Sequence, residues 1–441
     1  MAKHFQAMLR SDVRPRELWA WAMYDFANSG YTTVVITALF NAYFVAVVAG
    51  NAPWATFAWT AALSVSYMLI VLSAPLIGAY ADLHAVKKKL LAITTVGSVL
   101  FTALLSFAQP DTLWLTIVCV IVSNFFFGSG ENLIAAFLPE ISKTRAMGRI
   151  SGWGWSLGYI GGLITLGLCL MYVTWAEAQG QTANQFVPIT MLITAGIFAL
   201  ASIPTFLLLR ERAMPIEDRT NEGVAIGMAW LRVRQTMRNL RKFADLRRFL
   251  LCSLFYQAGI QAVITLTAVY ANQAMNFSIQ QTLLLVLVVN LTAAVGAFLF
   301  GHVQDRIGHV KTIALTLAGW IVTILLAWAA REPTLFWVAA NVAGLCLGAS
   351  QSASRALVGV LAPPSRAAEF FGLWGLAVKL ASVAGPLTYG AATWLTGGNH
   401  RQSLLVTGSY FVIGLLLLSG VNAVRGRRAA LRANRVQRLV L

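Results

Sequence analysis

The chain has 441 residues, of which 58% are hydrophobic and only 11% are charged. Soluble domains carry about 25% charged residues, so this composition excludes an ordinary water-soluble fold and indicates a protein of the lipid bilayer. The formal net charge of +17 therefore predicts membrane topology and contact with anionic membrane lipids. We expect no nucleic-acid partner.

Twelve stretches are long and apolar enough to cross a bilayer, because one helical crossing needs about 20 apolar residues. In chain order, the predicted spans are Trp19–Val48, Trp54–Tyr80, Leu90–Phe107, Leu113–Leu138, Gly152–Thr174, Pro188–Leu209, Phe249–Ala271, Thr282–Gly301, Thr312–Ala330, Thr334–Val358, Phe371–Leu395 and Ser403–Val424. The sequence thus predicts an all-α membrane protein with twelve transmembrane helices.

The positive charges orient these spans. All but four of the 33 Lys and Arg residues lie in the tails and in alternate loops, which share one side of the membrane. The exceptions are Arg331 and Arg401 in opposite loops, and Arg355 and Lys379 inside predicted spans. Since Lys and Arg accumulate in cytoplasmic loops, we predict a multi-pass protein with both termini cytoplasmic, in the inner membrane if the protein is bacterial.

No catalytic or metal-binding pattern stands out. The four cysteines occur singly in apolar spans, and the five histidines lie in the tail or loops, away from any plausible nucleophile. These positions predict neither a disulfide framework nor a metal site. We expect no cofactor and no enzymatic activity.

The two halves of the chain repeat each other. One constant offset places Gly78 on Gly301, Asp82 on Asp305 and Gly152 on Gly375. This pattern predicts two pseudo-symmetric six-helix bundles, with the solute site between them. The predicted parts are a first bundle, a basic cytoplasmic linker, a second bundle and a basic cytoplasmic tail, at residues 1–209, 210–248, 249–424 and 425–441.

The linker has apolar residues at roughly helical spacing among its arginines from Met228 onward. This spacing favours an amphipathic helix on the inner headgroups, and a solvated basic loop is the alternative. Glycines gather elsewhere, on the fifth span from Gly152 to Gly162 and on the eleventh at Gly372 and Gly375. Because small residues let helices approach closely in lipid, we expect these glycines at sliding contacts.

Two loops carry related strings, namely GAYADLHAVKKK (Gly78–Lys89) and GHVQDRIGHVK (Gly301–Lys311). They resemble the cytoplasmic gate motif of the major facilitator superfamily, with departures at Ala85 and Gln304. The resemblance implies that an Asp at a helix end binds nearby cations and a facing helix start; the alternative is that the lysines only anchor the topology. The implied gate residues are Gly78, Asp82, Lys88, Gly301, Asp305, Arg306 and Lys311.

Other strings resemble the autophagy-related vacuolar effluxer branch of that superfamily. They are WAMYDFANSGY (Trp21–Tyr31), NLIAAFLPEI (Asn132–Ile141), SGWGWSLGYIGG (Ser151–Gly162) and QSASRAL (Gln351–Leu357) with EFFGL (Glu369–Leu373). The resemblance implies a twelve-helix permease, and fungal members are credited with amino-acid export from vacuoles. The seventh span departs from the family, with YQAG at Tyr256–Gly259 where an acidic residue is usual.

Charged side chains inside spans are candidates for function because each costs at least about 2.5 kcal/mol near the bilayer centre. By analogy with the superfamily, spans 1, 4, 7 and 10 line a central cavity. Two carboxylates, Asp25 and Glu131, face two cations, Arg355 and Lys379. The predicted solute-contacting residues are Tyr24, Asp25, Asn28, Asn124, Glu131, Gln257, Gln261, Gln351, Arg355 and Lys379.

Such a cavity suits a zwitterion or small anion, because a guanidinium binds a carboxylate in bidentate fashion. The alternative is that the carboxylates pair with the cations and hold the halves together. Glu131 is the stronger candidate to carry a proton, and Asp25 the stronger candidate for a solute or gating contact.

We therefore predict a secondary active transporter. The expected partners are one small polar solute and protons, and the protein is expected to act as a monomer. The solute class expected is an amino acid or a related zwitterion or organic anion, moved by alternating access. The alternatives are an efflux pump for amphipathic or lipid-like compounds and a non-transporting receptor or scaffold.

Overall fold

The structure is a computed structural model that describes residues 6–213, 222–275 and 277–440. Among these residues, twelve helices are long and apolar enough to cross a membrane. The single backbone pairing of the β type in the described part of the chain joins Leu9 to Ser142. The predicted fold class is confirmed: the protein is an all-α membrane protein with twelve candidate spans.

The first six spans follow one another closely along the chain. The first is α2 (Pro15–Tyr31), which continues through π-helical turns at Thr32–Ala38 and Phe44–Val48 on either side of α3 (Phe40–Tyr43). The others are α4 (Ala55–His84), α5 (Lys87–Leu104), α6 (Leu113–Ala135) with the short α7 (Leu138–Ile141), α8 (Met147–Ala178) and α9 (Ala183–Leu208).

The second six spans come after the linker helix α10 (Glu222–Asn239). They are α11 (Ala244–Met275), α12 (Ile279–Ile307), α13 (His309–Ala329), α14 (Pro333–Leu361), α15 (Ala367–Leu395) and α16 (His400–Ser419). A last helix, α17 (Ala423–Val440), follows. The segment predicted as a basic tail is thus helical, and α11 begins a few residues before the predicted start of the second bundle.

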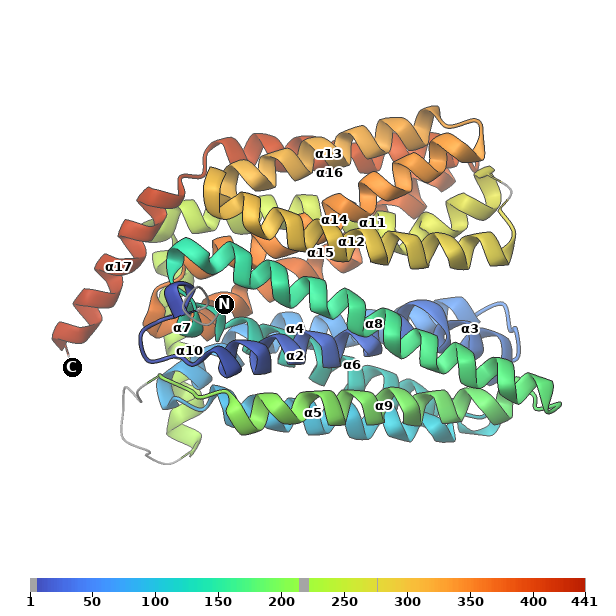
Figure 1. Cartoon of the computed structure of the whole chain (residues 1–441), viewed down its shortest axis with the longest axis horizontal. Helices are drawn as coiled ribbons and strands as arrows, with labels where there is room; N and C mark the ends of the chain where they lie inside the picture. The colour runs from blue at the N-terminus through green and yellow to red at the C-terminus, as the bar shows by residue number, and fades with distance from the viewer. Residues whose placement is uncertain (1–5, 214–221, 276, 441) are drawn as a thin grey trace.

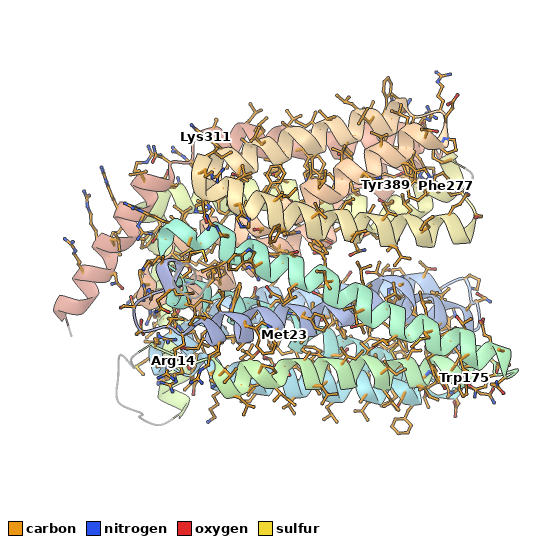
Figure 2. All side chains as sticks on the ribbon, viewed as in Figure 1. Arg14, Met23, Trp175, Phe277, Lys311 and Tyr389 are labelled. Carbon is orange, nitrogen blue, oxygen red and sulfur yellow. The ribbon has the colours of Figure 1, made fainter. Side chains whose placement is uncertain are left out.

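Two bundles lie side by side, α2 to α9 in one and α11 to α16 in the other (Figure 1). Both termini, α7, α10 and α17 lie at one end of the molecule. Arg14 and Lys311 lie near this end, and Trp175, Phe277 and Tyr389 lie toward the other (Figure 2). We call the end with both termini the basic end.

Glycines allow the two bundles to touch. A Cβ on Gly152 of α8 would lie 2.5 Å from the Ala297 carbonyl oxygen and 2.8 Å from the Gly301 Cα, both in α12. A Cβ on Gly78 of α4 would lie 2.2 Å from the Ala368 carbonyl oxygen of α15. The backbones therefore meet without intervening side chains, as expected for glycine-rich faces in lipid.

The ends of α4 and α12 show how the repeat is built. Ala85 ends α4 with φ +53°, and Gly308 at the equivalent repeat position ends α12 with φ +94°. Positive φ suits glycine and strains residues with a Cβ. The departure from the motif at Ala85 therefore keeps the backbone turn but places alanine in a left-handed conformation.

The linker helix α10 packs against both bundles. Ala229 lies in a small apolar cluster with Ala79 and Leu83 of α4. Arg232 Nε donates to Glu369 Oε2 of α15 over 3.2 Å. A helix therefore does form in the predicted linker. One of its faces is buried against protein, whereas Trp230 is exposed.

We predict that Gly152→Ala disrupts contact between the bundles, because its new methyl group meets backbone atoms of α12. The expected destabilisation is about 1–3 kcal/mol, as for overpacking elsewhere. Gly167→Ala is the matched control on the same helix, since its Cβ would meet nothing within 4 Å. Thermal unfolding of the two purified variants tests this, and equal melting temperatures would contradict it.

Candidate functional site

The first interaction across the bundles is a buried ion pair between Asp25 of α2 and Arg355 of α14. Arg355 Nη1 donates to Asp25 Oδ2 over 2.7 Å. The same guanidinium donates from Nε to the Ser151 hydroxyl (3.1 Å) and from Nη2 to the Ser151 carbonyl oxygen (2.9 Å). Arg355 thereby joins its own bundle to α2 and α8 of the other.

Aromatic rings and one glycine shape this site. The Arg355 guanidinium lies 4.7 Å from the Trp21 ring centroid and 5.4 Å from that of Trp155, both distances suited to cation–π attraction. A Cβ on Gly154 would lie 2.3 Å from Asp25 Oδ2 and 2.6 Å from Arg355 Nη2. The two tryptophans therefore flank the guanidinium, and Gly154 leaves room for the pair.

A second ion pair, between Glu131 of α6 and Lys379 of α15, also joins the bundles. Lys379 Nζ donates to Glu131 Oε2 over 3.1 Å. Its ammonium lies 5.5 Å from the Tyr67 ring centroid and 5.7 Å from that of Phe127. The Glu131 side chain is 33% exposed, against 10% for Asp25. Glu131 is therefore the more accessible of the two intramembrane carboxylates.

These two pairs match the alternative in which the carboxylates bind the cations and join the halves. The expectation that Arg355 is free to bind a solute carboxylate does not hold in this state. Its guanidinium already binds Asp25 and Ser151. In this arrangement Arg355 connects the bundles, and Lys379 is the cation beside the more accessible carboxylate.

Several predicted cavity residues lie elsewhere. Tyr24 is buried inside the first bundle, where its hydroxyl bonds to the Thr95 hydroxyl over 2.8 Å. The Asn124 amide donates to the Ser66 hydroxyl over 3.0 Å, also within that bundle. Each of these side chains bonds to a neighbouring helix of its own bundle. Asn28 is buried in α2.

The predicted amides of the second bundle bind each other. Gln257 Nε2 of α11 donates to Gln351 Oε1 of α14 over 2.9 Å, and Gln351 Nε2 donates back over 3.2 Å. Both side chains are buried. Gln261, one turn further along α11, is half-buried. Gln257 and Gln351 thus stabilise the packing of α11 against α14.

At the basic end, each gate aspartate binds the start of a helix in the other bundle. Asp82 Oδ2 accepts from the Glu369 backbone N–H of α15 over 2.9 Å. Asp305 Oδ1 and Oδ2 accept from the backbone N–H groups of Gly148 and Arg149 of α8, over 3.0 and 3.1 Å. A carboxylate there meets the partial positive charge of the helix start. The two aspartates thus hold the bundles together at this end.

The lysine beside Asp82 is Lys87, whereas Lys88, the predicted gate residue, binds elsewhere. Lys87 is buried, lies 3.6 Å from Asp82 and forms an ion pair with Glu140. Lys88 instead donates to the Leu209 carbonyl oxygen over 2.7 Å. Three lysines follow one another in the sequence, at 87, 88 and 89. Lys87 is the first residue of α5, and it is the one whose side chain is buried.

The second gate copy uses different residues. Arg306 and Lys311, both predicted gate residues, are exposed. Gln304, the departure from the motif, donates to the Gly148 carbonyl oxygen over 2.9 Å and to the Ser352 hydroxyl over 3.1 Å. The amide at position 304 therefore adds a contact between α12 and α8.

Sequence reasoning also missed an acidic centre at Glu369, the first residue of the quoted string EFFGL. Its carboxylate accepts from Arg366 Nε (2.9 Å) and Arg232 Nε (3.2 Å) and bonds to Thr236. The signal available was an isolated acidic residue at the start of a span, three residues after Arg366. Because Arg232 and Thr236 lie in the linker, no spacing within the span pointed to them.

Comparison with known families identifies the family of the chain. A family model described as "Vacuole effluxer Atg22 like" matches residues 55–431. The chain belongs to this family. It is an Atg22-like permease of the major facilitator superfamily, as the motifs of its gates and first span indicate.

Relatives of this Atg22-like permease are spread over bacteria and fungi. YxiO, an uncharacterised MFS-type transporter from Bacillus subtilis, is 26% identical over 409 residues, which are 91% of this chain and 94% of that protein. Autophagy-related protein 22 from Cryptococcus neoformans is 27% identical over 301 residues, which are 64% of this chain and 52% of the fungal protein. The chain is a transporter and not an enzyme.

Solved structures share the fold. The proton:xylose symporter XylE matches with a TM-score of 0.75 at 14% identity, over 95% of this chain and 98% of that one. The human organic anion transporter MFSD10 matches with a TM-score of 0.71 at 16% identity, over 91% and 99%. At these identities the likeness concerns the fold alone, and it confirms the major facilitator architecture of the Atg22-like permease.

We predict strong coupling between Asp25 and Arg355 of this permease. Removing one partner of a buried ion pair costs about 3–5 kcal/mol because the other charge stays buried and unpaired, whereas removing both costs much less. Thermal unfolding of Asp25→Asn, Arg355→Met and the double variant measures the interaction. Additive losses in the double variant would show that the pair is not coupled.

We also predict that Lys87→Ala destabilises the permease, because it leaves the carboxylates of Asp82 and Glu140 buried without their cation. The expected loss is about 3–5 kcal/mol. Lys89→Ala is the matched control: Lys89 is exposed, and such changes stay within about 0.5 kcal/mol. If melting temperatures fall equally in both variants, the assignment of Lys87 to the gate is wrong.

Proposed function

We propose that this permease is a secondary active transporter of a small zwitterion, an amino acid or a related organic anion, with Glu131 and Lys379 at its solute site. The observation that carries the proposal is the ion pair between these residues, which joins the two bundles over 3.1 Å while a third of the Glu131 side chain remains exposed. The proposal therefore places solute and proton at a charged group whose partner lies in the other half.

The chemistry around Lys379 suits both charges of a zwitterion. A solute carboxylate that replaces Glu131 gains the Lys379 ammonium as its counterion. The ring faces of Tyr67 and Phe127, which now surround that ammonium, attract a cationic group of the solute as well. A purely apolar compound uses none of these charges.

Proton coupling follows from the same pair. When Glu131 takes up a proton, it loses its charge and releases Lys379 to bind the solute carboxylate. When the solute and the proton leave, Lys379 and Glu131 pair again. Solute and proton binding are thereby linked at one place, and breaking the direct pair removes one of the contacts between the bundles.

A different role fits the Asp25–Arg355 pair and the two gate aspartates. We propose that these contacts form and break during alternating access. All of them join the two bundles in this state. We propose that Asp25 is a gating residue and Glu131 the proton-binding residue. The positive loops support cytoplasmic termini, in the inner membrane if the protein is bacterial, and we propose that the monomer is the transporting unit.

The test uses purified protein in proteoliposomes. A thermal-shift screen of amino acids, organic anions and amphipathic cations first identifies a solute. We expect Glu131→Gln to abolish accumulation driven by a pH gradient and to retain counterflow without a gradient, because glutamine imitates the protonated carboxyl group but binds no proton. Wild-type protein and both assays are run in parallel.

Glu177→Gln is the matched control, since Glu177 is an exposed carboxylate of α8. It should transport as the wild type does. Undiminished proton-driven accumulation in Glu131→Gln would refute the proton-binding role. A screen in which only amphipathic cations stabilise the protein would favour the alternative of an efflux pump for amphipathic compounds.

A further inference from the structure

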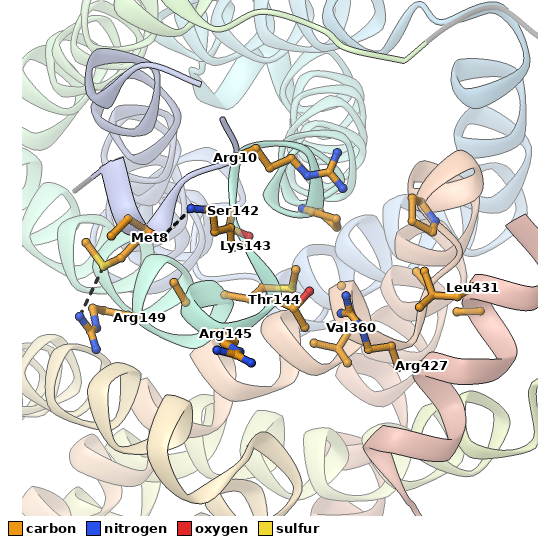
Figure 3. Close-up of a pocket in the computed structure, with 18 residues that line it drawn as sticks. Met8, Arg10, Ser142, Lys143, Thr144, Arg145, Arg149, Val360, Arg427 and Leu431 are labelled. Atoms are coloured by element: carbon orange, nitrogen blue, oxygen red, sulfur yellow. Dashed lines mark hydrogen bonds between the residues drawn. The ribbon is translucent and has the colours of Figure 1, made fainter. Parts of the chain in front are cut away.

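A cavity of about 750 Å³ lies between the two bundles at the basic end. One side of it comes from the N-terminal segment and the loop before α8, with Arg10, Lys143 and Arg145. The other side comes from the end of α14 and from α17, with Val360 and Arg427. Figure 3 shows these residues around one hollow. The cavity therefore belongs to both halves of the molecule and lies outside the pair of charged residues assigned to solute.

Positive charge dominates the lining. Five cationic residues line the cavity, and none of the described lining residues is acidic; the cations are Arg10, Lys143, Arg145, Arg149 and Arg427. The volume is within the range of small-molecule sites, about 300–1,000 Å³. Size and charge both favour a small anion as the occupant.

Most of these cations have no counterion in the described parts of the chain. Arg149 lies 3.8 Å from Asp305, but no ion pair there involves Arg10, Lys143, Arg145 or Arg427. Burial, and then the charge of Arg10, lower the pKa of Arg427 below the usual arginine value. The cations thus repel one another across the contact between the bundles.

We propose that this cavity binds a phosphate-bearing anion that joins the two bundles at the basic end. Arginine guanidinium groups bind phosphate oxygens through paired hydrogen bonds, and the cavity presents arginines from both bundles. Phosphate of this kind has two sources next to such a cavity, the headgroup of an anionic lipid and a soluble phosphorylated metabolite. Both supply the same group.

The bound anion has a conformational effect, because its ligands come from both halves. It replaces repulsion between cations by attraction to a shared anion, and so it stabilises the state in which the bundles touch at this end. When the bundles separate, the cations move apart and the site is lost. The anion therefore regulates alternating access from a place remote from Glu131 and Lys379, and this inference does not depend on the identity of the transported solute.

The test measures pyrophosphate binding by calorimetry to the full chain in nanodiscs of phosphatidylcholine. The Arg145→Gln/Arg427→Gln double variant removes one cation from each side of the cavity. We expect its affinity to fall roughly tenfold or more, as loss of charge-assisted hydrogen bonds to phosphate implies. Spin labels at Lys89→Cys and Ser419→Cys, both exposed at the basic end of opposite bundles, report whether pyrophosphate increases the population with the ends in contact.

The matched control is Arg428→Gln/Arg435→Gln, which removes the same charge from exposed positions of α17 that do not line the cavity. It should bind pyrophosphate as the wild type does. Equal weakening in both double variants, or no pyrophosphate binding by a wild-type protein with normal thermal unfolding, would overturn the proposal.

Adding phosphatidylglycerol to the nanodiscs distinguishes the two sources. If the lipid supplies the phosphate, the contact population rises without pyrophosphate and the apparent pyrophosphate affinity falls, in the wild type and not in Arg145→Gln/Arg427→Gln. If a soluble anion is the ligand, pyrophosphate acts equally with and without phosphatidylglycerol. Either result supports a phosphate site in this cavity.

Discussion

The two halves of this permease are joined by charge where the surrounding solvent is hydrocarbon. A buried ion pair is costly to form and more costly to break on one side only, so Asp25 and Arg355 bind each other when the bundles meet. The guanidinium also donates to Ser151 and lies over the rings of Trp21 and Trp155. Gly154 leaves room for the pair because it has no side chain. This arrangement gives the glycine-rich and tryptophan-rich string of α8 a structural role, because the string forms the wall against which an arginine from the other bundle packs.

The repeat gives both bundles an aspartate at the same place, and each aspartate accepts hydrogen bonds from a helix start in the other bundle. The copies differ beyond that point. The first adds Lys87 and Glu140, whereas the second adds Arg149 and the amide of Gln304. The two equivalent carboxylates therefore have different charged and polar neighbours, although each binds a helix start in the other bundle.

The fold was predictable from the sequence because hydrophobic stretches of bilayer length and the alternation of positive loops are properties of the chain itself. The offset that matches Asp82 to Asp305 likewise needs no structure. The sequence does not show which of two adjacent residues on a helix faces the other bundle. Adjacent residues point about 100° apart, so Tyr24 bonds inside its own bundle while Asp25 reaches Arg355. The partner of a long side chain, as with Glu369 and the linker arginine Arg232, depends on tertiary packing alone.

The linker helix α10 has a mechanical consequence. It is fastened to α4 through Ala229 and to α15 through Arg232, and these two helices belong to opposite bundles that part when the basic end opens. Because α10 contacts both bundles, it limits how far they can separate unless one of the two contacts breaks. The apolar attachment to α4 has no single bond to break, whereas the one to α15 is an ion pair of which only 11% of the Arg232 side chain and 1% of the Glu369 side chain are exposed, so salt screens it little. Wide opening at the basic end therefore requires α10 to separate from one of the two bundles.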